Sequence, residues 1–229
     1  MVKYEFAEFI KGCTDGFTPV IDTQYLKTDF VHIDLSGENK DLNKIEIPSA
    51  TEYKKYIDEY LASKKGRVAY GGYNERRNLY QQSVIFQDDS KPSPREVHIG
   101  VDLWCEAGTT VVAPLDGTIH SFNDNEGFGN YGPTIILEHN IGDKTFYTLY
   151  GHLSRPSIKN LAFGQIIEAG DKIGVLGTSK VNGDYSPHLH FQIIENLQGF
   201  TGDYPGVVAK QELESYLKNC PDPNFLLKI

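Results

Sequence analysis

Residues 186–193 read SPHLHFQI, and this short stretch indicates both a β-strand and a candidate site. Successive side chains of a strand point to opposite faces. Leu189 and Phe191 therefore share one face, and their apolar side chains suit a protein core. His188 and His190 share the other face, where two imidazoles are placed to meet a common partner.

The sequence around this strand is rich in β-branched residues. From residue 97 to 195, short runs of them alternate with glycine turns, at residues 110–113, 117–120, 134–138, 146–150 and 172–176. Short strands with this spacing predict an antiparallel all-β unit. Residues 112–119 and 167–174 look like related half-motifs, each a strand, a tight turn and a second strand, so the fold class is predicted to be mainly β.

The flanking segments have helical character. Residues 1–12 predict a short amphipathic helix, residues 209–219 predict a helix that Pro221 ends, and residues 30–33 and 45–47 are strand-like. Residues 49–64 are the clearest helix, because Ser49 and Glu52 can form a capping box and apolar side chains recur at positions i, i+3 and i+4. We therefore predict an N-terminal α+β annex and a C-terminal helix around the β unit.

A polar, proline-bearing link at residues 88–94 separates the N-terminal segment, with its two predicted helices, from the β-rich sequence. Such stretches are typical of domain boundaries. The predicted organisation is an N-terminal annex at residues 1–94, a β domain at 95–200 and a helical tail at 201–229.

The composition excludes some partners and suggests a location. The 229 residues carry a net charge of −9 and no basic stripe, which argues against nucleic acid as a main partner. No window approaches the ~18 apolar residues of a membrane span. Three scattered cysteines and an N-terminus without an apolar leader lead us to expect a cytoplasmic protein. No pattern indicates an oligomeric state.

A second histidine motif lies upstream, at residues 98–102, which read HIGVD. A tight turn aided by Gly100 would let His98 and Asp102 converge. Two neutral imidazoles and one carboxylate form a donor set suited to zinc, and a site with three protein ligands keeps a position open for catalysis. Cys105 reads as a buried thiol instead of a ligand. His32, His120 and His139 read as structural histidines.

Three ordered motifs resemble the lysostaphin-type, or LytM-domain, zinc metallopeptidases. They are HIGVD at residues 98–102, YGHLS at 150–154 and PHLHF at 187–191. Glycine turns at residues 108–111, 113–117 and 164–174 are also similar to that family. The resemblance covers about residues 95–195, less than half of the chain.

The resemblance implies a role for each motif residue. It implies that His98, Asp102 and His190 bind Zn²⁺, and that His152 and His188 assist catalysis, without deciding which of the two is the general base. It also implies a groove on an antiparallel sheet within residues 95–200. The implied substrates are glycine-rich or D-amino-acid peptides, as in peptidoglycan or the muropeptides derived from it.

Two other functions stay open at this stage. One is a non-catalytic LytM-like module that binds or activates a partner, since some such domains are degenerate. The other is a phosphohistidine carrier, because the paired half-motifs resemble the barrel of such carriers. A cluster at residues 73–80 adds a hypothesis that Arg76 or Arg77 contacts a substrate carboxylate, against the simpler interpretation of surface and packing residues.

Overall fold

The computed structural model describes residues 5–42, 49–77 and 94–229. The helices are α1 (Glu5–Gly12), α2 (Ala50–Lys64), α3 (Leu213–Asn219) and α4 (Asn224–Leu227). The strands are β1 (Phe30–His32), β2 (Val68–Gly71), β3 (Glu75–Arg76), β4 (Arg95–His98), β5 (Val101–Trp104), β6 (Thr110–Val112), β7 (Gly117–Asn125), β8 (Gly132–Ile141), β9 (Lys144–Gly151), β10 (Ile166–Ile167), β11 (Lys172–Val175), β12 (His188–Ile194) and β13 (Val207–Ala209).

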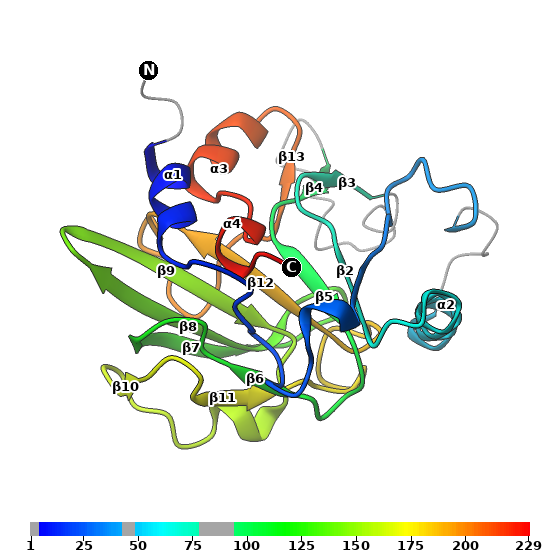
Figure 1. Ribbon diagram of the computed structural model, residues 1–229, viewed down its shortest axis with the longest axis horizontal. Coiled ribbons are helices and arrows are strands. Elements are labelled where there is room, and N and C mark those ends of the chain that lie inside the picture. The colour runs from blue at the N-terminus through cyan, green and yellow to red at the C-terminus, as the bar shows by residue number, and fades with distance from the viewer. Residues whose placement is uncertain (1–4, 43–48, 78–93) are drawn as a thin grey trace.

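One large sheet organises the molecule (Figure 1). Its eight strands run in the order β1-β2-β5-β12-β9-β8-β7-β10, and the only parallel pair among them is β1 with β2. Two smaller sheets, β11-β6 and β13-β4-β3, complete the strand pairing of the described residues. The prediction of a mainly β fold with an antiparallel sheet and a C-terminal helix is confirmed.

The N-terminal part is an α+β segment, as predicted, but its strands continue the large sheet. β2 pairs with β5, and β1 adds to β2 at the sheet edge. The two ends of the chain also meet, since the Thr14 hydroxyl donates to the Leu226 carbonyl at 2.7 Å and α1 lies beside α4 (Figure 1). The division at residues 1–94, 95–200 and 201–229 stays a prediction.

Local signals account for several helix boundaries. The Ser49 side chain accepts from the Glu52 amide at the start of α2, so the predicted capping box is present. The tail helix begins at Leu213 and not at residue 209, because Ala209 still belongs to β13, where it pairs with Arg95 of β4. The strand predicted at residues 45–47 and most of the link at 88–94 lie outside the described residues.

The alternation of β12 positions the site over the core. Leu189, Phe191 and Ile193 are fully buried in the main hydrophobic cluster, with Val101 and Leu103 of β5. On the opposite face, β12 carries His188, His190 and Gln192, and β5 carries Asp102. None of the helices in the described ranges has the length and apolar character needed to cross a bilayer.

Candidate metal and catalytic site

Strand register brings two of the predicted ligands together. β12 runs antiparallel to β5, and His190 lies directly opposite Asp102 in the register. Directly opposed residues of an antiparallel pair share a face and lie close. His188 is opposite Trp104 in the same way, and their rings stack with centroids 5.6 Å apart. The alternation predicted for residues 188–191 is therefore observed.

The third predicted ligand, His98, arrives from another sheet. It ends β4, and the short connection through Gly100 leads into β5. A Cβ atom at Gly100 would lie 2.5 Å from Cε1 of His190, which no side chain tolerates. Glycine is thus required here because the backbone passes directly over the His190 ring.

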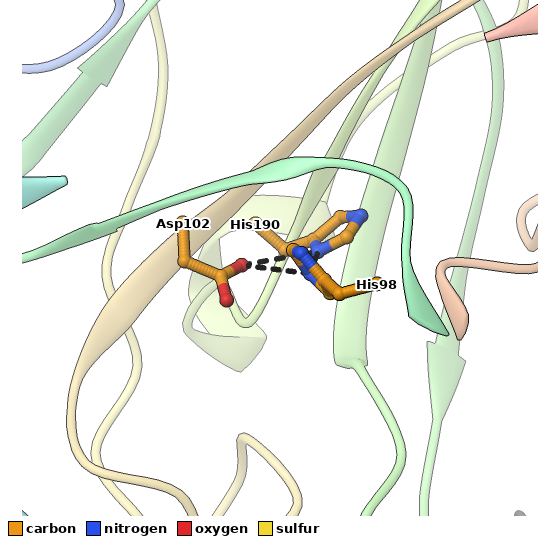
Figure 2. A group of neighbouring side chains, drawn as sticks. All are labelled: His98, Asp102 and His190. Atoms are coloured by element: carbon orange, nitrogen blue, oxygen red, sulfur yellow. Dashed lines mark hydrogen bonds and ion pairs between the residues drawn. The ribbon is translucent and has the colours of Figure 1, made fainter. Parts of the chain in front are cut away.

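Three donor atoms converge in the buried centre of this arrangement (Figure 2). Nε2 of His98 lies 2.8 Å from Nδ1 of His190 and 3.2 Å from Oδ1 of Asp102. Nδ1 of His190 lies 3.1 Å from the same oxygen. All three side chains are at most 3% exposed. The structure therefore brings together all three residues that the sequence singled out as ligands.

Hydrogen bonds at the ring nitrogens that point away from Asp102 determine the tautomers of His98 and His190. Nδ1 of His98 lies 2.9 Å from the Gly72 carbonyl oxygen, which only accepts, so this nitrogen carries the proton. Nε2 of His190 lies 2.9 Å from Oε1 of Gln192 and donates to it. The two inner nitrogens, which face Asp102, therefore carry lone pairs. Ligand histidines are oriented in this way in metal sites.

Gln192 was not singled out in the sequence. Its amide nitrogen donates to the Pro205 carbonyl at 3.2 Å, which leaves its oxygen to face His190. The strand pattern contained the signal, since residue 192 is two positions from His190 and shares its face. The identity of the bonding partners came only from the tertiary structure.

His152 and His188 lie beside the three donors as a second pair. Their ring centroids are 4.2 Å apart. Nδ1 of His152 donates to the Asn182 carbonyl at 2.9 Å, and Nδ1 of His188 donates to the Ser186 carbonyl at 2.7 Å. Each ring therefore keeps a free lone pair on Nε2. That of His188 is 3.9 Å from Oδ1 of Asp102.

All five predicted site residues line one cavity of about 380 Å³. Its walls include the aromatic rings of Trp104, Tyr131 and Tyr185. The Tyr131 hydroxyl lies 3.3 Å from Nε2 of His190, and its ring centroid lies 5.4 Å from that of His152. Neither tyrosine was identified from the sequence, because tyrosine is common in this chain and neither residue lies in a distinctive motif.

The two arginines of the polar cluster have different environments. Arg76 is exposed and pairs with Glu96 at 2.9 Å. Arg77 is 4% exposed and donates from its guanidinium to Asp102 at 2.6 Å and to Glu75 at 2.5 Å. In this structure Arg77 thus contacts carboxylates of the protein itself.

The other histidines and Cys105 have separate environments. His139 is buried between the Asp116 carbonyl and the Thr148 hydroxyl, whereas His32 is exposed. His120 pairs with Ser121. Burial raises the pKa of the Cys105 thiol to about 12, and in the described part of the chain the donor cluster is His98, Asp102 and His190 without it.

Burial controls the protonation of the site. It lowers the pKa of His188 to about 4 and holds the pKa of His152 well below its usual 6.5, where the neighbouring His188 adds to the effect. Burial would raise the pKa of Asp102, but the Arg77 guanidinium beside it holds that pKa well below 3.8. At neutral pH, His188 and His152 are thus neutral and Asp102 is ionised.

The lowered pKa of His188 predicts that acid destabilises the metal-free protein. An unfolded histidine binds a proton below pH 6.5, whereas folded His188 does so only near pH 4. The unfolded state therefore binds more protons in this range, so the free energy of unfolding falls as the pH falls from 6.5 to about 4. A shift of this size corresponds to roughly 3 kcal/mol.

Urea unfolding of the metal-free protein across this pH range measures the effect. His188→Gln should flatten the pH dependence, while His32→Gln, at an exposed position, should leave it unchanged. Equal pH dependence in the wild type and His188→Gln would contradict this prediction.

Several known proteins are similar to this chain. Residues 96–201 match peptidase family M23. A curated relative from Haemophilus influenzae, described as an uncharacterized metalloprotease, is 33% identical over 137 residues, which are 57% of this chain. The chain spans 27% of that relative's length.

Two solved structures are also similar. The catalytic domain of lysostaphin, an antimicrobial peptidase from Staphylococcus simulans, is 30% identical with a TM-score of 0.37, over 52% of this chain and 80% of that one. Helicobacter pylori Csd3 is 23% identical with a TM-score of 0.33, over 55% of this chain and 32% of that one. By the match of residues 96–201, which contain the three converging donors and both further histidines, this chain belongs to peptidase family M23.

Proposed function

We propose that this chain is a zinc-dependent metallopeptidase in which His98, Asp102 and His190 hold the metal. The observation that carries the proposal is the set of three lone-pair atoms that face one another at 2.8–3.2 Å in a buried site. Lone pairs at such distances repel one another unless a proton or a metal ion lies among them. The family match of residues 96–201 supports a peptidase over other metal proteins.

The donor set fits zinc in chemistry and in size. Imidazole nitrogen and carboxylate oxygen are common zinc ligands, with bonds of about 2.0–2.2 Å. A tetrahedral ion with such bonds sets its ligand atoms about 3.3–3.6 Å apart, whereas these donors stand 2.8, 3.1 and 3.2 Å apart. Small side-chain movements would therefore open the site enough.

Bound zinc would polarise the scissile carbonyl and lower the pKa of a water molecule, which is the chemistry that peptide hydrolysis requires. His188 and His152 supply acid–base chemistry from the adjacent wall. Each has its Nδ1 proton held by a backbone carbonyl, so each Nε2 is free to accept the proton of the attacking water and return it to the leaving amine. Because a backbone carbonyl holds both histidines in the same way, these contacts do not decide which of the two is the general base.

The proposed substrates are peptides rich in glycine or D-amino acids, such as those of peptidoglycan and muropeptides. This substrate class follows from the resemblance of the motifs to the lysostaphin-type enzymes. An aromatic-walled cavity that reaches both histidines is consistent with an extended peptide chain.

The phosphohistidine-carrier alternative is disfavoured by charge. Asp102 stands 3.1–3.2 Å from the inner nitrogens of both His98 and His190. An ionised carboxylate at that distance would repel a phosphoryl group on either ring. A non-catalytic module would also be expected to have lost part of the donor set, which is complete in this chain.

Chelation tests the proposed function. Treating the purified protein with a zinc chelator should remove one equivalent of zinc and abolish cleavage of oligoglycine or muropeptides, and added Zn²⁺ should restore it. Metal analysis and product detection by mass spectrometry measure the two effects. Protein that carries no stoichiometric zinc when purified would contradict the zinc site, and zinc-loaded protein that cleaves neither substrate would favour the non-catalytic module.

A further inference from the structure

We propose that residues 71–77, which precede the family-matched region, are a supporting segment that holds two of the three metal ligands in their binding geometry. Within this segment, the Gly72 carbonyl positions His98 and the Arg77 guanidinium positions Asp102. The inference rests on the proposed zinc site. It assigns a function to a part of the chain that the family comparison leaves without one.

The backbone of the supporting segment pairs with the strands that carry His98 and Asp102. On one side of its turn, β2 places Gly71 opposite Asp102. On the other side, β3 places Glu75 opposite His98. The turn between them uses left-handed backbone at Gly72, with φ of 102°, and at Asn74, with φ of 53°. One short turn therefore joins β2, the partner of the strand that carries Asp102, to β3, the partner of the strand that carries His98.

Arg77 divides the two oxygens of Asp102 between different partners. Its Nη1 donates to Oδ2 at 2.6 Å, while Oδ1 faces the inner nitrogens of His98 and His190. A carboxylate with one oxygen tied in this way is held as a ligand through its other oxygen. The backbone amide of Arg77 donates to the Glu96 carbonyl at 3.0 Å, which fixes the start of the side chain.

Glu75 balances the positive charge that Arg77 brings close to the proposed metal site. An isolated guanidinium beside a metal site would repel the metal ion. Nε of Arg77 donates to Glu75 at 2.5 Å, so its positive charge is balanced by a carboxylate other than Asp102. The guanidinium also lies over the Trp104 ring, 5.5 Å from its centroid. We therefore expect the positioning effect on zinc affinity to outweigh the repulsion.

Gly72 couples the two contacts. Its carbonyl accepts from Nδ1 of His98, and a Cβ atom at Gly72 would lie 2.1 Å from Nη2 of Arg77 and 3.0 Å from Nδ1 of His98. The turn thus packs against both groups at distances that only glycine permits. His98 and Asp102 are supported by one structural unit.

Variants of Arg77 in the full chain test the proposal. Arg77→Met removes the charge and all donors. Arg77→Lys keeps the charge but lacks the planar fork that reaches Glu75 and Asp102 together. Arg76→Met is the matched control, because the neighbouring Arg76 is exposed and pairs with Glu96. The dissociation constant for Zn²⁺ is measured by competition with a chelating dye, and the coordination is followed by the visible absorption of the Co²⁺-loaded protein.

Arg77→Met should weaken zinc binding by about 10- to 100-fold, the usual effect of losing a group that orients a metal ligand. Its Co²⁺ spectrum should also change, because Asp102 is no longer restricted to one oxygen. Arg77→Lys should be weakened and spectrally altered as well, and Arg76→Met should match the wild type. A change in thermal stability alone would not alter the Co²⁺ spectrum.

Wild-type affinity and an unaltered Co²⁺ spectrum in Arg77→Met would overturn the inference while leaving the proposed function intact. If Arg77→Met does not fold, the same two measurements on Arg77→Lys decide, and wild-type values there would overturn it. Failure of the wild type itself to bind zinc would instead refute the proposed zinc site.

Discussion

His190→Ala is expected to lose zinc binding and peptide hydrolysis together. His190 supplies one of three donors, and its replacement leaves His98 and Asp102 as the only protein ligands of the proposed site. Sites with four ligands bind zinc with about 10–16 kcal/mol, so one ligand contributes on the order of 3 kcal/mol. That loss corresponds to at least ~100-fold in the zinc dissociation constant, and hydrolysis should fall below detection.

Metal analysis and a cleavage assay of His190→Ala measure this result, with circular dichroism to confirm folding. His120→Ala is the matched control, since His120 lies on β7 of the same sheet and pairs with Ser121 away from the donors. The control should retain zinc and activity. A His190→Ala protein that keeps one equivalent of zinc with wild-type affinity would remove His190 from the ligand set.

His152→Ala and His188→Ala are expected to separate catalysis from metal binding. Both side chains line the cavity, and both have a free Nε2, but neither belongs to the cluster of converging donors. Loss of a general acid or base typically costs 10²–10⁴-fold in rate. We therefore expect kcat to fall by about that factor, while zinc stays bound in a one-to-one ratio.

Steady-state kinetics and metal analysis of both variants check this expectation. If the two histidines act in the same step, the double variant should lose much less than the product of the two single losses. Unchanged kcat in either variant would exclude that histidine from the reaction. Loss of zinc from either variant would show that it supports the metal site and would end its assignment as an acid–base group.

Local patterns were sufficient for part of this fold. The alternation at residues 188–191 predicted which side chains of β12 face the core, because the two-residue period of a strand is a property of its own backbone. The Ser49 and Glu52 capping box predicted the start of α2 for the same kind of reason. The tail was less predictable, since pairing with β4 and not local propensity decides that residues 207–209 form a strand.

The sequence by itself determined that His98, Asp102, His152, His188 and His190 are the candidate site, through their motifs and through family resemblance. Only the tertiary structure decided how they meet. Cross-strand register places His190 opposite Asp102, and no local period encodes the register between strands that are about 90 residues apart.

The supporting groups likewise became visible only in the folded chain. Arg77 reads as a surface residue in the sequence, and it is buried because β3 pairs with β4 and directs it toward Asp102. Gln192 selects the tautomer of His190 only because the Pro205 carbonyl lies within reach of its amide. Donor types are local properties of residues, whereas their partners and protonation depend on segments that folding brings together.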